Sequence, residues 1–107
     1  TASGTQDITI SGFGTIKAAI VHANVASDPM VSWGLIDGSG DENTMSNFHS
    51  VQAENFQSAS THLLTMYDGS SVNQNCTASI ITDGIRLTWT KQGSPSGTAN
   101  IFCLFFK

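Results

Sequence analysis

Charged residues are scarce in this sequence. They make up 11% of the 107 residues, whereas an average soluble protein has about 25%. The four cations, Lys17, Arg86, Lys91 and Lys107, are scattered along the chain, and the net charge is -4. Binding to a phosphate backbone requires clustered cations that release counterions. We therefore predict that nucleic acid is not a partner.

Long hydrophobic runs are absent as well. No stretch of about 18 or more apolar residues occurs, so the sequence predicts no insertion into a membrane. It also shows no signal-peptide pattern. The chain begins at Thr1 rather than Met, which fits either a processed chain or a piece of a longer one.

Cysteine is rare, with only Cys76 and Cys103. One interpretation is two buried thiols that pack as small hydrophobic side chains. The other is a disulfide that joins the terminal strand to the strand near residue 76, which would require an oxidising compartment. The sequence leaves both interpretations open.

Short apolar or alternating runs are abundant. They follow one another at a spacing of roughly 10 to 15 residues and are separated by Gly, Asn, Asp and Ser. This pattern predicts all-β structure, namely a single antiparallel β-sandwich domain of about eight strands over residues 1–107, jelly-roll-like in arrangement. The expected strands cover residues 8–10, 18–23, 31–36, 44–51, 62–67, 76–81, 85–90 and 101–106. Residues 51–60 are expected to form at most one turn of helix.

Alternation within strands predicts which side chains face the core. In residues 85–90, Ile85, Leu87 and Trp89 share one face, and their polar neighbours share the other. By the same reasoning Trp33 shares a face with Val31 and Leu35. Both tryptophans are therefore expected in the core, although with Tyr67 they are also candidates for a sugar-stacking platform.

The segment "GFGTIK", residues 12–17, raises the question of a phosphate-binding loop. A dinucleotide fingerprint requires a third glycine where Lys17 stands, and a helix after it. The residues that follow, including Ile20 and Val21, favour a strand. We therefore predict a tight corner, with Phe13 closing the end of the sandwich and Lys17 at the start of a strand.

Taken together, the segments "ITISGFG", "KAAIVHANV", "VSWGLIDGSG", "ITDGIRLTWT" and "ANIFCLFF" resemble a small β-sandwich module that recurs in virion proteins of tailed bacteriophages. Ile16 stands where that module often has Pro, and Ile85 stands where it often has Phe. The resemblance spans nearly the whole chain but rests on fold-forming positions. It implies a structural or adhesive role on a phage particle, as a head decoration, head fibre or tail protein, and carries over no catalytic motif.

Candidate sites outside this resemblance are few. Asp37, Asp41 and Glu42 surround a Gly-Ser-Gly turn and are weak candidates for binding Ca²⁺, although their spacing fits no EF-hand. A solvated turn is the alternative interpretation. The sequence predicts no catalytic residue and no cofactor.

Subunit contact is the more promising function for the remaining apolar residues. Phe48 and Phe56 lie in a polar segment, and aromatic side chains commonly anchor interfaces. The final strand is apolar on both faces, which indicates either a central position or a covered outer face. The predicted interface residues are Phe48, Phe56, Phe102, Leu104 and Phe106.

The sequence therefore predicts a non-enzymatic structural protein located on the virion surface. Its expected partners are other virion subunits, with a homo-oligomer, preferentially a trimer, as the assembly. The alternative is a secreted or extracellular carbohydrate- or receptor-binding adhesin module of the same fold, which would bind a host-surface glycan through exposed aromatic side chains.

Overall fold

The computed structural model describes the backbone of residues 3–25, 30–40, 42–50, 53–59, 61–67, 73–94 and 98–107. Side chains are described for the same residues except 30, 42–50, 53–59 and 67. All regular structure in these residues is β-strand, and no helix among them is long and apolar enough to cross a membrane.

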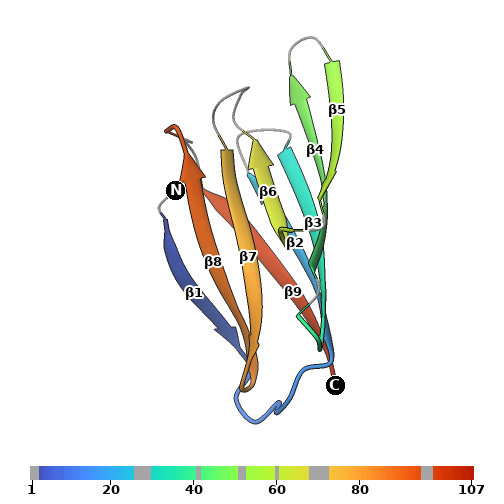
Figure 1. Cartoon of the computed structure of the whole chain (residues 1–107), viewed down its shortest axis with the longest axis vertical. Helices are drawn as coiled ribbons and strands as arrows, with labels where there is room; N and C mark the ends of the chain where they lie inside the picture. The colour runs from blue at the N-terminus through green and yellow to red at the C-terminus, as the bar shows by residue number, and fades with distance from the viewer. Residues whose placement is uncertain are drawn as a thin grey trace.

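Two antiparallel sheets make up the fold (Figure 1). The four-stranded sheet has the order β1-β8-β7-β6, and the five-stranded sheet has the order β5-β4-β3-β2-β9. The strands are β1 (Gly4–Thr9), β2 (Ala18–Val25), β3 (Met30–Asp37), β4 (Glu42–Ser50), β5 (Ala53–Ala59), β6 (Leu64–Tyr67), β7 (Asn73–Ile81), β8 (Gly84–Gln92) and β9 (Ala99–Phe106).

The prediction of all-β, antiparallel structure is confirmed, but the strand count differs from the expected eight. The additional strand is β5, which lies in the segment expected to form at most a turn of helix. β5 pairs with β4 from Thr44↔Ala59 to Ser50↔Ala53. Its sequence has no apolar stripe of either period, so backbone pairing with β4 decides its conformation. In Figure 1 this hairpin extends beyond the other strands at one end of the molecule.

One hydrophobic core lies between the two sheets. The four-stranded sheet contributes Leu64, Met66, Cys76, Ile85 and Leu87, and the five-stranded sheet contributes Ala19, Val21, Ala23 and Ile36. The predicted alternation in β8 is confirmed, because Ile85 and Leu87 are fully buried while Trp89 packs against the core.

β3 faces the opposite way from the prediction. Trp33 is 50% exposed and Leu35 55%, whereas Ser32 and Ile36 are buried. The cause is the close approach of the segment that leads into β6. A Cβ atom on Gly34 would overlap the carbonyl oxygen of Leu63 and lie 2.7 Å from its carbonyl carbon. Only the side of β3 with small residues fits there, so the large side chains point outward.

A buried hydrogen bond holds the same contact between the sheets. The Thr65 backbone N–H donates to Ser32 Oγ over 3.0 Å. Because this bond satisfies a buried backbone donor, the small polar side chain at residue 32 has a defined role inside the core. Together, Gly34 and Ser32 set the separation of the sheets at this point.

The Gly-Phe-Gly segment forms the predicted corner before β2. Gly12 and Gly14 have φ of 76° and 87°, which glycine adopts without strain. Phe13 packs against the core with its ring edge-on to Phe105, at 5.9 Å between centroids. The predictions for this segment are therefore confirmed.

Candidate interaction surface

The outward side of β9 is apolar and exposed. β9 lies at the end of its sheet beside β2, so the structure excludes a central position for this strand. Ile101, Cys103 and Phe105 point inward and pack against the core. On the other side, Phe102 is 67% exposed, Leu104 63% and Phe106 47%. Three of the predicted interface residues therefore lie together on an outer face.

Two rows of side chains continue this face across three strands. In the first row, His22 of β2 pairs with Phe102 of β9 and with Trp33 of β3. Its ring centroid lies 6.3 Å from that of Phe102 and 4.4 Å from that of Trp33. In the second row, Ile20 pairs with Leu104 on one side and Leu35 on the other. We define the outer apolar surface as the set Ile20, His22, Trp33, Leu35, Phe102, Leu104 and Phe106.

The area of this surface is comparable to that of the largest apolar patch on a typical monomer. An aromatic side chain has about 150–250 Å² of surface, so the exposed fractions of the five most exposed members leave roughly 500 Å² in contact with solvent. The largest apolar patch on a typical monomer is about 300–600 Å² and is often functional. The two rows contain no Lys, Arg, Asp or Glu. The surface thus has the composition of the core of a protein contact, since it lacks charged pairs and is rich in aromatic residues.

Trp33 belongs to this surface because of an inversion that sequence reasoning missed. Hydrophobicity alone assigned Val31, Trp33 and Leu35 to the core. The signal against that assignment was the alternation of small residues at Ser32 and Gly34, which is typical of a strand approached closely by another backbone.

Phe48 and Phe56, the other predicted interface residues, have their backbones in β4 and β5, and their side chains lie outside those the structure describes. The register pairs Phe48 with Asn55 and Asn47 with Phe56. β4 also pairs with β3 along Met30↔Phe48 to Ile36↔Glu42. Their backbones therefore continue the sheet that carries the outer apolar surface.

The candidate metal-binding residues are only partly described. Asp41 lies outside the described residues, and so does the Glu42 side chain. Asp37 Oδ1 accepts a hydrogen bond from the Ser39 N–H over 2.8 Å, which is the local pattern of an Asx-type turn. Among the described residues, no group of three or more His, Cys, Asp or Glu is arranged to hold a metal ion.

The backbone amides of the glycine corner donate hydrogen bonds to the carboxylate of Asp83. Asp83 accepts hydrogen bonds from the Gly14 N–H over 2.6 Å and from the Gly12 N–H over 3.1 Å. These bonds hold the pKa of Asp83 below its ordinary value. The donors that a phosphate loop would direct at a ligand are therefore used within the fold, as the corner interpretation requires.

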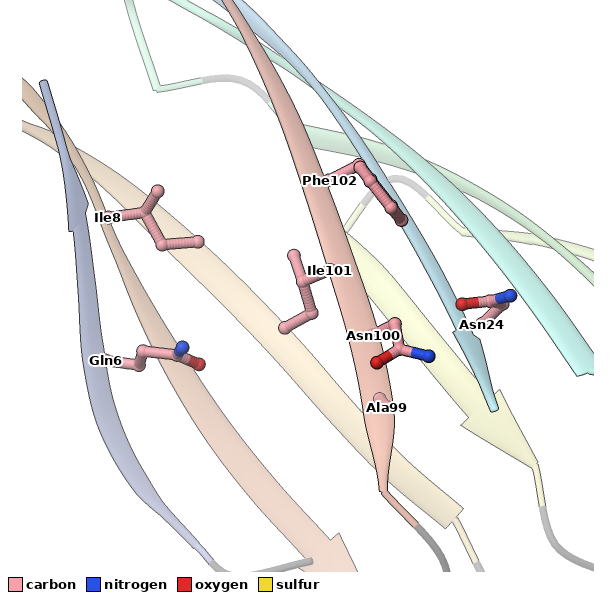
Figure 2. A pocket seen from close by; sticks show the side chains of 7 residues that line it. All are labelled: Gln6, Ile8, Asn24, Ala99, Asn100, Ile101 and Phe102. Atoms are coloured by element: carbon pink, nitrogen blue, oxygen red, sulfur yellow. The ribbon is translucent and has the colours of Figure 1, made fainter. Parts of the chain in front are cut away.

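An open hollow of about 690 Å³ lies between β1 and β9, which are end strands of the two sheets. Figure 2 shows Gln6 and Ile8 of β1 facing Ile101 of β9, with Asn100, Phe102 and Asn24 beyond β9. Asn24 Oδ1 is buried there without a hydrogen-bond partner. The hollow has no charged lining residue and adjoins the outer apolar surface at Phe102.

Both cysteines are thiols. Cys76 is buried and its Sγ donates to the carbonyl of Thr77 over 3.4 Å. Burial raises the pKa of the Cys103 thiol to about 11, because an apolar environment disfavours the thiolate. The structure thus agrees with the interpretation of two packed thiols rather than with a disulfide.

Comparison with known proteins identifies no relative of this chain. No family model matches the chain, and neither a curated protein nor a solved structure matches it.

Proposed function

We propose that this chain is a non-enzymatic structural subunit of a virus particle, a phage head decoration, head fibre or tail component, that docks on neighbouring subunits through the outer apolar surface. The observation that carries the proposal is the exposure of Trp33, Leu35, Phe102, Leu104 and Phe106 on one sheet face. Contacts with other subunits remove such a face from water, and burial of apolar area is the main source of association free energy.

Two sequence features support the virion setting within this proposal. The segments that resemble the phage module overlap the end of β1 with the corner after it, and cover most of β2, β3, β8 and β9. The low charge fraction suits a protein whose surface is largely covered by neighbours. The jelly-roll-like arrangement and a homo-oligomer also remain parts of the proposal, and the pairing of β1 with β8 and of β2 with β9 joins strands from the first and last quarters of the chain.

Immunogold labelling tests the virion assignment. An antibody against the folded chain is applied to intact particles purified from the sample that carries the sequence. We expect gold on the head or the tail of the particles. Labelling of soluble or cell-surface material, with the particles unlabelled, would contradict a virion location.

A second candidate function is carbohydrate or receptor binding by an extracellular adhesin. The observation that favours it is the exposed row Phe102–His22–Trp33, with the amides of Asn24 and Asn100 one step along the same strands. Aromatic faces that stack on sugar rings, together with a few amides, are typical of ligand sites. A glycan array with wild type and a Trp33→Ala variant tests it, because a stacking site loses its signal in the variant.

A further inference from the structure

We propose that the occupant of the outer apolar surface is a second copy of this chain, packed sheet against sheet about a twofold axis that passes near Ile20 and His22. The inference rests on the proposed function because it uses the same surface, and it adds the identity of the partner, a second copy of the chain. β2 holds the middle position of the three strands that carry the surface, with β9 on one side and β3 on the other.

The five most exposed side chains of the surface supply more than half of the area that a stable self-contact buries on each partner, roughly 500 of about 800 Å². This area counts an aromatic side chain as about 150–250 Å². The half-buried side chains of Ile20 and His22 lie between these five, and the half-buried Val31 lies beside them on β3. All three extend the contact.

Charge also favours a second copy over a partner selected by electrostatics. The chain carries a net charge of -4, so two copies repel one another, and a contact surface without like charges adds no close repulsion to this. The two rows of the surface contain no Lys, Arg, Asp or Glu, with His22 as their one titratable residue, and the described Asp7–Arg86 pair lies on the other sheet. A charged partner would find no complementary group in these rows.

Geometry favours two copies in one contact. A sheet face is covered completely by one other sheet face at about 10 Å, as in sandwich packing. Around a threefold axis each face meets its neighbours only along its margins. A twofold contact is self-complementary, so His22 and Ile20 of one copy lie opposite the same strand of its partner.

The test is the solution mass of the full chain by light scattering, from about 1 to about 200 µM, a range that brackets moderate dissociation constants. We expect wild type to have twice the chain mass at high concentration. A Phe102→Ser, Leu104→Ser double variant, which removes the two most exposed anchors of the surface, weakens self-association at least about 30-fold. The control is Ile10→Ser, because Ile10 is 53% exposed after the end of β1 and lies outside the surface.

A Trp33→Ser variant separates face packing from pairing of β9 edges. Trp33 lies on β3, two strands away from the edge strand β9. If the copies pair through their β9 edges, the variant keeps the mass of wild type, whereas face packing predicts that the variant dissociates. Circular dichroism melts of all variants confirm that each remains folded. Loss of mass in both surface variants, with the control unchanged, supports the proposal.

Three results would overturn it. A wild type that is monomeric over the whole range excludes a second copy as occupant, while particle labelling still decides the proposed function separately. A monomer that binds glycans through Trp33 assigns the surface to a sugar. A threefold mass that the surface variants abolish overturns the twofold arrangement.

Discussion

Replacement of Gly34 by alanine is the sharpest test of why the apolar side of β3 faces solvent. An added Cβ overlaps the Leu63 carbonyl oxygen and lies 2.7 Å from the carbonyl carbon and 2.8 Å from Leu63 Cδ1. The main obstruction is backbone rather than the end of a flexible side chain, so the two sheets must separate locally. The change therefore acts on the contact that sets the orientation of Trp33.

The magnitude follows from two costs. Overpacking a core commonly costs about 1–3 kcal/mol, and a backbone obstruction places this variant near the upper end. Separation of the sheets also weakens the bond from the Thr65 N–H to Ser32 Oγ, and an unsatisfied buried donor costs about 1–3 kcal/mol. We expect a loss of about 3 kcal/mol or more in unfolding free energy, which lowers the melting temperature by roughly 12–24 °C in a domain of this size.

Urea titration and thermal melts followed by circular dichroism measure this loss. The matched control is Gly38→Ala. The nearest atom to its added Cβ is the Lys17 carbonyl oxygen at 3.2 Å, and its backbone is not in the left-handed region. We expect a change of about 1 kcal/mol or less in the control. A Gly34→Ala variant that melts within about 5 °C of wild type would refute the close contact at Leu63 and the explanation built on it.

Three further changes test individual interactions. Ser32→Ala removes the acceptor for the buried Thr65 N–H and is expected to lower the unfolding free energy by about 1–3 kcal/mol, measured by urea titration; an unchanged midpoint contradicts this. Because the folded-state pKa of Asp83 is lowered, its stabilisation is complete above its unfolded pKa and is lost as the pH falls through the folded value. The melting temperature of wild type should therefore decline below about pH 4, and that of Asp83→Asn should decline less steeply. An equal decline in the two proteins would contradict the assignment. Cys103, with a pKa of about 11, should react with a disulfide reagent at pH 8 much more slowly in the folded than in the urea-unfolded chain, and equal rates would contradict its burial.

The all-β class of the fold and the orientation of β8 could be predicted from the sequence. Ile85 and Leu87 alternate with Arg86 and Thr88, so the orientation of β8 follows from period two alone. The glycine corner was also predictable, since Lys17 stands where the fingerprint requires glycine. Asp83, which holds that corner, was not, because it lies about 70 residues further along the chain.

β3 and β5 show why the remainder was not predictable. In β3 the more apolar face, with Trp33 and Leu35, points outward, because the orientation of the strand depends on where Leu63 arrives in space, which local pattern does not contain. β5 has no hydrophobic period, so its conformation depends on pairing with β4. For the candidate site, the apolar final strand indicated a covered face, but the contribution of Trp33 and Leu35 depended on the orientation of β3.

The tie between Asp83 and the Gly12–Gly14 corner also sets an order of events during synthesis. β1 pairs with β8, and β2 pairs with β9, so neither of the first two strands has its complete set of neighbours until nearly the whole chain has left the ribosome. The carboxylate that closes the corner emerges after more than three quarters of the 107 residues. Folds dominated by such distant pairings form in about milliseconds to seconds, far more slowly than helical domains. Until then the inward-facing side chains of β2, such as Val21, lack the core that covers them in the folded protein, so the newly made chain depends on rapid closure, or on a chaperone, to avoid aggregation.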